Sequence, residues 1–338
     1  MKLIIGLLSI CFAIMISYHS AYPVESNTGK INKRFVKIDT FTPDNFSAIY
    51  RNEWKMKPTE ISGTLYFPDG DGPFPAVILY HGSGHPRRLE PWFKELVPGL
   101  VGAGIATFVL DSYTSRGILG TASDQTKLSK AARVVDAFQA LKKLASFSMI
   151  DENKIGISGY SFGGIVAMVS ADMRLVDAGL ADGKKFAAHL PVYPSCQAQF
   201  RTLKLTGAPM LFLVGELDDY TPAKYCVSYV ERMVKEGYNA TIKVYPGAYH
   251  SWIINHGITR CNSCLTFGDC GLLYLEDDGH EVALNGNATT RDGWKQYVAT
   301  LSRRCGKRGV TLRVDQKARQ DTLETTINFF LKALVSQN

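Results

Sequence analysis

The sequence predicts an α/β fold in which a mostly parallel, eight-stranded sheet is flanked by helices. Short apolar runs alternate along the chain with longer segments of helical spacing, which is the pattern of strand–helix–strand units. Several runs, such as 75–80, are apolar at consecutive positions, as expected for strands covered on both faces. With 338 residues, of which 46% are hydrophobic and 20% charged, the chain can bury a large core.

The individual elements follow from these runs in chain order. The predicted strands cover 35–41, 61–67, 75–80, 105–110, 155–158, 186–192, 210–214 and 240–245. The predicted helices cover 90–103, 127–145, 164–173, 222–236 and 321–335. Region 251–316 breaks the alternation, because it has little periodicity and contains four cysteines. A structureless loop of that length is unusual in a compact domain, so we expect a disulfide-stapled insertion that forms part of a functional site's wall.

The N-terminus has the pattern of a secretory signal peptide. Met1 and Lys2 supply a short positive start, residues 3–16 are almost wholly apolar, and polar residues follow from Ser17. We therefore predict a signal peptide over 1–21, a loose segment over 22–34 and one folded domain over 35–338. A lipoprotein signal through Cys11 and an uncleaved anchor are the alternatives. The prediction places the mature protein in the periplasm or outside the cell, with no membrane contact after cleavage.

The cysteines fit an exported protein. Loss of the signal peptide removes Cys11 and leaves an even number, which in an oxidising compartment predicts disulfide bonds. The pairing does not follow from the sequence, although Cys196 with Cys226 is favoured because both should follow C-terminal strand ends. The alternative is a zinc site, which is weaker because only one CxxC is present. The residues concerned are Cys196, Cys226, Cys261, Cys264, Cys270 and Cys305, with His280 as another candidate zinc ligand.

The positive charge does not indicate a nucleic-acid partner. The formal net charge is +7, but basic and acidic residues are interleaved along the chain. The densest basic run, 303–308, is interpreted as a solvated face, because no recognisable nucleic-acid motif accompanies it. We therefore expect no nucleic acid among the partners.

The stretch 154–170 carries the most informative motif, a G-x-S-x-G around Ser161. The motif lies between a predicted strand and a predicted helix, which is the context of a nucleophile elbow. Gly159 and Gly163 permit the close backbone approach that such a turn needs. The free N–H groups at the start of the helix face Ser161 and can stabilise negative charge on an attacked carbonyl. The motif alone is short enough to occur by chance, so its interpretation depends on partners elsewhere.

A serine nucleophile needs a general base and an acid that orients it. Asp218 follows the strand over 210–214, and His250 follows the strand over 240–245, in the order serine, acid, histidine. Asp219 is the closest rival acid, with capping of the helix at Pro222 as its expected role, and Glu216 is a distant rival. The sequence thus predicts a triad of Ser161, Asp218 and His250.

Two backbone N–H groups are needed to stabilise the oxyanion. The residue after the nucleophile, Phe162, is expected to supply one of them. The other should come from the loop after the strand over 75–80, where Ser83 is favoured over Gly82 and Gly84.

These motifs resemble the dienelactone hydrolase family of the α/β-hydrolase fold, and more closely its exported relatives. The matching pieces are YHGSG at 80–84, LDSYTSRG at 110–117, RVVDAFQAL at 133–141, GYSFGG at 159–164, GELDDYTP at 215–222 and YPGAYHSW at 245–252. The resemblance implies the same triad and the cleavage of ester-like bonds. The chain departs from the namesake enzymes, which carry a cysteine nucleophile, because it has Ser161. This departure moves the expected chemistry from dienelactones toward general esters.

Further candidates for substrate contact lie beside the triad. Arg116 is a candidate for holding a substrate carboxylate, with an ion pair to Asp111 or Asp136 as the alternative. The full set of candidate substrate-binding residues is Gly82, Gly84, Tyr113, Arg116 and Tyr160.

We therefore expect an exported serine hydrolase that cleaves small-molecule esters or lactones through an acyl-enzyme on Ser161. No metal or organic cofactor is expected, because the triad supplies nucleophile, base and acid. The same fold and triad also serve peptidases of the prolyl-oligopeptidase type and acyltransferases, and a non-catalytic binding protein is the third alternative. The sequence does not indicate an oligomeric state.

Overall fold

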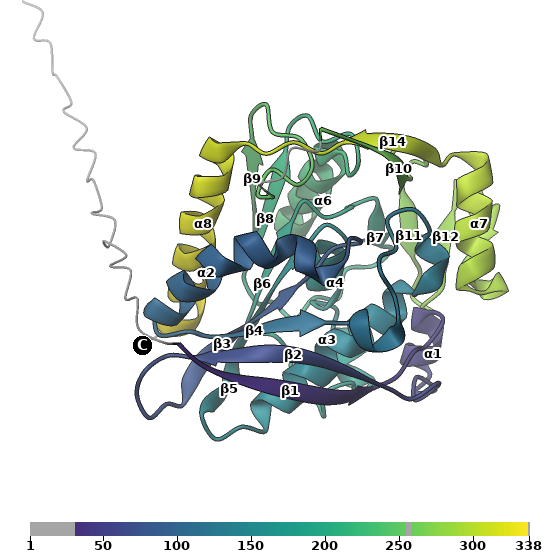
Figure 1. The fold of residues 1–338 in the computed structure, drawn as a ribbon. Helices are drawn as coiled ribbons and strands as arrows, with labels where there is room; N and C mark the ends of the chain where they lie inside the picture. The colour runs from purple at the N-terminus through teal and green to yellow at the C-terminus, as the bar shows by residue number, and fades with distance from the viewer. Residues whose placement is uncertain (1–30, 255–258, 337–338) are drawn as a thin grey trace, which may run out of the picture.

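A computed structural model describes residues 31–254 and 259–336, and its centre is an eight-stranded sheet (Figure 1). The strand order is β1-β2-β4-β3-β5-β6-β8-β9, in which β1–β2 and β2–β4 are antiparallel and the other pairs are parallel. The predicted mostly parallel sheet is therefore confirmed. The bounds are β1 Asn32–Thr40, β2 Thr59–Phe67, β3 Phe74–Tyr80, β4 Ala106–Asp111, β5 Ile150–Tyr160, β6 Ala188–Val192, β8 Met210–Gly215 and β9 Ala240–Tyr245.

Helices cover both faces of the sheet. Successive side chains of a strand point to opposite faces, and in the central strands both sets are apolar, so both faces need to be covered. On β3, Val77 and Leu79 pack in one buried cluster with α2 (Glu90–Gly102) and α8 (Gln316–Phe330). The alternate residues Ala76 and Ile78 pack in the other with α3 (Lys130–Ala145), α4 (Phe162–Val169) and α6 (Ala223–Lys235). The continuous apolar runs of the sequence reflect this double coverage.

Several boundaries differ from the predicted ones. The last helix begins at Gln316 instead of residue 321, because the Asp315 side chain caps it by accepting a hydrogen bond from Ala318 N at 2.9 Å. Strand β1 begins at Asn32, so residues 32–34 are not loose but pair with β2. The predicted signal peptide over 1–21, and residues 22–30 of the predicted loose segment, lie outside the described residues. No helix of the described chain combines the length and apolar character needed to cross a membrane.

The region predicted as an insertion forms small elements of its own at the side of the molecule opposite α8 (Figure 1). Strand β11 (Leu273–Leu275) pairs with β7 (Ala198–Phe200), which lies between β6 and β8 in the sequence, so the insertion is joined to the main sheet's connections. Helix α7 (Trp294–Arg304) packs Trp294, Tyr297 and Leu301 into a small apolar cluster. The remaining strands are β10 Arg260–Thr266, β12 Glu281–Ala283, β13 Ala288–Thr289 and β14 Lys307–Thr311.

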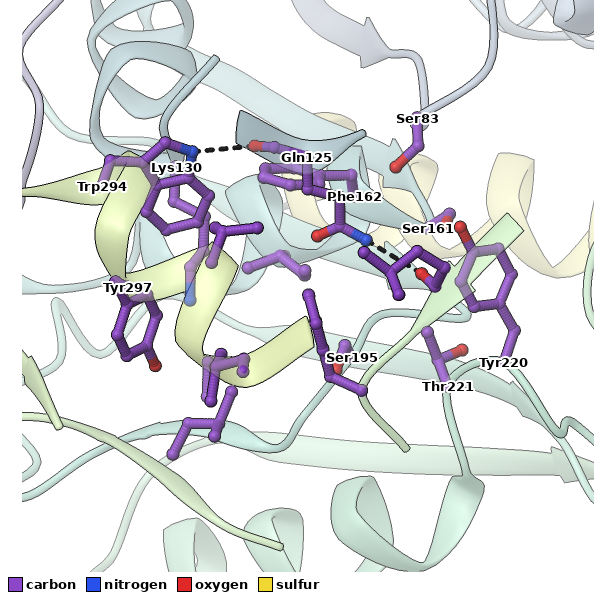
Figure 2. A pocket seen from close by; sticks show the side chains of 17 residues that line it. Ser83, Gln125, Lys130, Ser161, Phe162, Ser195, Tyr220, Thr221, Trp294 and Tyr297 are labelled. Carbon is purple, nitrogen blue, oxygen red and sulfur yellow. Dashed lines mark hydrogen bonds between the residues drawn. The ribbon is translucent and has the colours of Figure 1, made fainter. Parts of the chain in front are cut away.

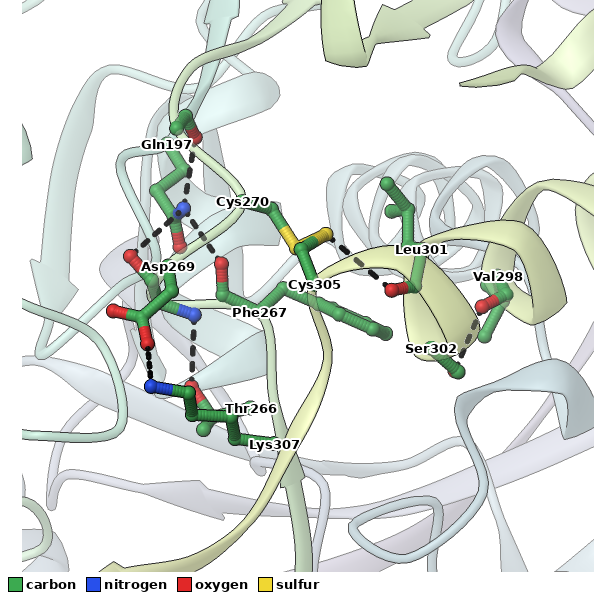
Figure 3. The surroundings of a disulfide bond; sticks show 12 residues. Gln197, Thr266, Phe267, Asp269, Cys270, Val298, Leu301, Ser302, Cys305 and Lys307 are labelled. Carbon is green, nitrogen blue, oxygen red and sulfur yellow. Dashed lines mark hydrogen bonds and ion pairs between the residues drawn. A yellow bond between two sulfur atoms is a disulfide. The ribbon is translucent and has the colours of Figure 1, made fainter. Parts of the chain in front are cut away.

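The six cysteines downstream of Cys11 form three disulfide bonds. Cys196 pairs with Cys226, as favoured from the sequence, and the other bonds are Cys261–Cys264 and Cys270–Cys305. Figure 3 shows Cys270–Cys305 joining the loop after β10 to the end of α7, next to Gln197, which donates to Phe267 O at 2.8 Å. The alternative prediction of a zinc site is wrong, because the cysteines proposed as its ligands form disulfide bonds with one another. Cys261–Cys264 and Cys270–Cys305 both lie within the insertion, whereas Cys196–Cys226 joins the loop after β6 to α6.

Candidate active site

Ser161 lies at the turn between β5 and α4, where the backbone is strained. Its φ of +55° and ψ of −113° put a residue with a side chain in a region normally left to glycine. The turn is tight, since a Cβ at Gly159 would lie 1.9 Å from Gly163 O and a Cβ at Gly163 would lie 2.2 Å from Tyr80 O. Glycine at both positions therefore lets the chain turn sharply and present the Ser161 side chain at the start of α4.

Three side chains that are distant in the sequence meet beside this turn. Ser161 follows β5, Asp218 follows β8 and His250 follows β9, and the carboxyl ends of these parallel strands lie at one edge of the sheet. Asp218 Oδ2 is 2.7 Å from His250 Nδ1, and His250 Nε2 is 3.0 Å from Ser161 Oγ. Because a carboxylate can only accept, Nδ1 donates to Asp218 and Nε2 is left to accept the Ser161 hydroxyl.

The Asp218 carboxylate is held by its own loop. Its Oδ1 accepts hydrogen bonds from the N–H groups of Tyr220 and Thr221, each at 2.8 Å. The Thr221 hydroxyl donates to Asp218 Oδ2 at 2.9 Å and lies 3.1 Å from His250 Nδ1. Asp218 is only 5% exposed, so these donors stabilise a carboxylate that water hardly reaches. Thr221 is absent from the predicted site, although a threonine three residues after an aspartate is a recognisable loop signal.

The two rival acids point elsewhere. The Asp219 carboxylate accepts from Thr311 N at 2.8 Å and from Thr311 Oγ1 at 2.9 Å. The expectation that Asp219 caps α6 is therefore wrong. Asp219 instead connects the Asp218 loop to β14. Glu216 accepts from Gly247 N at 2.8 Å on the surface.

The imidazole of His250 is sandwiched by aromatic side chains. Its ring centroid lies 4.7 Å from that of Tyr193 and 4.8 Å from that of Tyr220, and His250 is 2% exposed. The two tyrosines restrict the ring to the orientation that reaches both Asp218 and Ser161. Neither tyrosine is among the predicted site residues, because aromatic residues in loops have no distinguishing pattern.

The predicted oxyanion amides lie next to the Ser161 turn. Phe162 is the first residue of α4, so its N–H has no acceptor within the helix. Ser83 is buried in the loop after β3, and that loop packs directly on the turn, since a Cβ at Gly82 would lie 3.2 Å from Ser161 Cβ. Gly82 and Gly84 line a cavity that Ser161 also lines.

His81 fixes this loop as a neutral imidazole. Its Nδ1 donates to Gly82 O at 2.9 Å, and its Nε2 accepts from Ser112 N at 3.2 Å. Burial, with the nearby charge of Arg133 as a second cause, lowers the pKa of His81 to about 3. His81 therefore carries no charge at neutral pH, and its two ring nitrogens hold the loop in place.

Arg133 supports the same loop from behind. Its buried guanidinium donates to His81 O at 2.6 Å and to Tyr113 Oη at 3.0 Å. The guanidinium carbon also lies 4.3 Å from the centroid of the Phe162 ring. The cation thus contacts Phe162 and the loop that carries Ser83. Arg133 is not among the predicted site residues, although it begins the RVVDAFQAL motif.

Arg116 does not face the site, which corrects the prediction that it holds a substrate carboxylate. Its Nη1 and Nη2 donate to the two carboxylate oxygens of Asp136 at 2.7 and 2.9 Å, and both side chains are buried. The predicted alternative, an ion pair, is therefore the observed one. Asp111 is instead occupied with the N–H groups of Tyr113 and Thr114, at 2.8 and 2.9 Å.

The two predicted tyrosine contacts have different outcomes. Tyr113 is wrong as a substrate contact, because it is fully buried and lines neither cavity beside Ser161. Its hydroxyl bonds to Thr121 Oγ1 at 2.9 Å and to Arg133. Tyr160 lines one of these cavities, although its hydroxyl accepts from Trp92 Nε1 at 2.9 Å.

Two cavities flank Ser161, with about 630 and 570 Å³ of space that opens to solvent. We call the first the α7 cavity (Figure 2); its apolar walls include Ile165, Phe267, Trp294, Val298 and Leu301. We call the second the His250 cavity; besides His250 its walls include Leu89, Ala122, Tyr193 and Ile254. The cavities share Ser83, Ser161 and Tyr220. The insertion thus forms part of the wall around Ser161.

The chain is similar to known hydrolases over its central part. It is 27% identical to esterase EstD of Thermotoga maritima over 168 residues, which is 47% of this chain and 39% of that relative. It is 24% identical to a protein of Bradyrhizobium sp. named a probable 2-oxo-3-(5-oxofuran-2-ylidene)propanoate lactonase, over 54% of this chain and 74% of that one. The fold matches the structure of Thermogutta terrifontis esterase 2 phosphorylated by paraoxon, with a TM-score of 0.50 and 16% identity over 82% of this chain and 92% of that one.

A family model places these similarities in one group. The model of the dienelactone hydrolase family matches residues 61–264, which include Ser161, Asp218 and His250. The match covers more than half of the chain. The chain belongs to the dienelactone hydrolase family.

Proposed function

We propose that the chain is an exported serine hydrolase that cleaves carboxylic esters or lactones through an acyl-enzyme on Ser161. The observation that carries the proposal is the relay of two hydrogen bonds from Ser161 Oγ through His250 to Asp218, at 3.0 and 2.7 Å. Such a relay activates a hydroxyl that is otherwise a poor nucleophile. The relatives named as an esterase and a lactonase support the class of bond.

Acylation would begin with attack of Ser161 Oγ on the carbonyl carbon of the ester. The Oγ–C bond forms while the hydroxyl proton passes to His250 Nε2, and the negative carbonyl oxygen accepts hydrogen bonds from the Ser83 and Phe162 amides. His250 then gives that proton to the alkoxide oxygen as its bond to carbon breaks, and the alcohol leaves. Asp218 stabilises the imidazolium that exists between these steps.

Deacylation would repeat the sequence with water. His250 Nε2 takes a proton from water, the hydroxide oxygen bonds to the acyl carbon, and the proton passes to Ser161 Oγ as the acid departs. The charges that develop are met by groups already in place, namely the Asp218 carboxylate and the amides beside Arg133. The proposed steps therefore use side chains and backbone amides of the chain itself, together with water.

The serine nucleophile bears on the substrate class. The namesake enzymes of the family carry cysteine at this place, and the present chain has Ser161 at a turn that a serine side chain fits. A hydroxyl paired with a buried histidine is suited to general ester chemistry. We therefore propose carboxylic esters and lactones, rather than dienelactones alone, as substrates.

Export is proposed from the cysteines and the N-terminal sequence. Three disulfide bonds are typical of proteins that fold in an oxidising compartment. The apolar run over 3–16 after Lys2 has the pattern of a signal peptide. A periplasmic or secreted location satisfies both observations.

Replacement of the nucleophile tests the proposed function. In a Ser161→Ala variant we expect kcat/KM for short-chain nitrophenyl esters to fall by about 10³-fold or more, because the residue that forms the acyl-enzyme is missing. The melting temperature should remain close to that of the parent, since the change removes one oxygen atom. A fluorophosphonate probe should label the parent at Ser161, as located by mass spectrometry, and should not label the variant. A variant that hydrolyses these esters as fast as the parent would contradict the proposal.

A further inference from the structure

Tyr220 stands between the α7 cavity and the His250 cavity. It lines both, and among the described residues only Ser83 and Ser161 do the same. Figure 2 shows the Tyr220 ring beside Ser161, with the hydroxyl at the end of the ring nearer to Ser161. The phenol ring therefore acts as a partition next to the nucleophile.

The partition is held in place from both sides. The Tyr220 N–H donates to Asp218 Oδ1 at 2.8 Å, and the Tyr220 carbonyl accepts from Thr266 Oγ1 at 2.8 Å. The ring packs on the His250 imidazole and against Cys264 and Leu312. Thr266 and Cys264 belong to β10, so the insertion fixes the position of the partition relative to the triad.

The Tyr220 hydroxyl is an unpaired hydrogen-bond donor among the described residues. It is buried and has no partner among the described residues, while the residue as a whole is 9% exposed. A buried donor left unpaired is unfavourable, so this hydroxyl would gain from an acceptor supplied by a bound ligand. Burial raises the pKa of Tyr220, so the hydroxyl keeps its proton and is available as a donor.

The α7 cavity suits an apolar group. Its walls include the side chains of Phe267, Trp294, Val298 and Leu301. Within the described part of the chain, the one charged residue that lines it is Lys130, which forms a buried ion pair with Glu281. Because this charge is already neutralised, the cavity favours a hydrocarbon or aromatic group over an anionic one.

The position of His250 decides the orientation of an ester. His250 lines only the second of the two cavities. In the proposed reaction it must reach the alkoxide oxygen to return the proton, so the alcohol part has to lie on its side of Ser161. The acyl part then lies on the opposite side, in the α7 cavity.

We propose that Tyr220 divides the site into an acyl subsite, which is the α7 cavity, and an alcohol subsite, which is the His250 cavity, and that its hydroxyl donates a hydrogen bond to the ester group between them. This proposal rests on the proposed function, because it assumes acyl transfer to Ser161. The substrates it identifies are esters of apolar carboxylic acids, recognised by the insertion through α7.

The same substitution in each cavity tests the division. Ala198 lines the α7 cavity and Ala122 lines the His250 cavity, and both are partly exposed. In Ala198→Phe we expect the ratio of kcat/KM for nitrophenyl octanoate to that for nitrophenyl acetate to fall about ten-fold or more, because a bulky ring displaces a long acyl chain. In Ala122→Phe the ratio for benzyl butyrate to methyl butyrate should fall about ten-fold. Each variant should leave the other ratio within about two-fold of the parent.

Removal of the hydroxyl alone tests the hydrogen bond. In Tyr220→Phe the ring and therefore the partition remain, so both selectivity ratios should match those of the parent. We expect kcat to fall about ten-fold or more for every ester, with KM changed less, because the donor is lost at the reacting group. A Tyr220→Phe variant with the parent's kcat would overturn the hydrogen bond.

The proposed function and the division into subsites can fail separately. If the parent shows neither fluorophosphonate labelling of Ser161 nor ester hydrolysis, the proposed function fails. Suppose that the parent is labelled and active. If Ala198→Phe and Ala122→Phe then change the same ratio, or each changes the ratio assigned to the other, the division into subsites is overturned. Melting temperatures of all three variants identify any effect that comes from misfolding.

Discussion

At the scale of single residues, two adjacent acids in one loop have different surroundings. Asp218 is buried, accepts from two backbone N–H groups and the Thr221 hydroxyl, and contacts His250. Asp219 is exposed and contacts Thr311 on β14. Only Asp218 can orient the imidazole, whereas Asp219 joins the loop to the insertion.

This difference predicts opposite outcomes for one substitution at two neighbouring positions. In Asp218→Asn we expect kcat to fall about 10³- to 10⁴-fold, because an amide can donate to His250 Nδ1 and favour the wrong tautomer. In Asp219→Asn, the matched control, kcat should change less than about three-fold. Steady-state kinetics with a nitrophenyl ester measure both. Equal losses in the two variants would contradict the assignment of the acid.

Residue patterns predicted the groups with a fixed order along the chain and failed for those defined by packing. Ser161, Asp218 and His250 each follow a predicted strand, so their approach to one edge of the sheet could be inferred. The partner of Arg116 could not, because two acids were within reach along the sequence and only the fold brings Asp136 to it. The place of Tyr220 beside Ser161 could not be predicted either, because it depends on packing of the insertion against the tyrosine ring.

At the scale of elements, the turn from β5 to α4 depends on the absence of side chains. A Cβ at Gly159 would collide with the backbone oxygen of Gly163, which cannot move without displacing α4. By contrast, a Cβ at Gly102, in the last turn of α2, would meet no atom within 4 Å. Glycine is therefore sterically required at position 159, whereas position 102 has room for a larger residue.

An alanine at each of these glycines tests the turn. In Gly159→Ala we expect the free energy of unfolding to fall by several kcal/mol and the esterase activity to be lost, since the backbone must shift beside Ser161. In Gly102→Ala the free energy of unfolding should stay equal or rise by about 0.5–1 kcal/mol, because alanine favours the helix. Urea titrations of both variants give these values. Normal stability and activity in Gly159→Ala would refute the steric argument.

Elements also differ in how far the sequence reveals them. Central strands of the main sheet such as β3 and β8 could be predicted because double coverage makes them continuously apolar, whereas the outer strands β1, β2 and β9 mix polar and apolar residues. The insertion could not be resolved into elements, since β11, β12 and β13 span only two or three residues each and are too short to show a period. Their stability comes from the Cys270–Cys305 bond and from pairing with β7, which are long-range contacts.

At the scale of the whole molecule, two buried histidines link folding to pH. His189 lies in β6, and its Nδ1 donates to Ala167 O at 2.8 Å. Burial lowers the pKa of His189 to about 4, and burial together with the charge of Arg133 lowers that of His81 to about 3. Both rings are therefore neutral in the folded protein over a range in which the unfolded chain, with histidine pKa values near 6.5, binds protons.

This linkage predicts that the protein loses stability on acidification well above the range of the carboxylates. Between about pH 6.5 and pH 4 the unfolded chain binds more protons than the folded one, so the free energy of unfolding falls as the pH falls. Each histidine contributes a slope of about 1.4 kcal/mol per pH unit inside this range, and the contribution is fully present above pH 6.5.

A variant at His189 isolates one of the two contributions. In His189→Asn the amide can still donate to Ala167 O but cannot bind a proton, so the slope between pH 6 and pH 4.5 should decrease by about 1.4 kcal/mol per pH unit. Between pH 7.5 and pH 8.5 the parent and the variant should show parallel curves, because a histidine with an unfolded pKa near 6.5 is almost wholly neutral there in both states. Denaturant unfolding at a series of pH values measures both ranges. An unchanged slope in the acidic range would mean that His189 accepts a proton within the folded core, and the neutral, buried ring inferred from its surroundings would have to be abandoned.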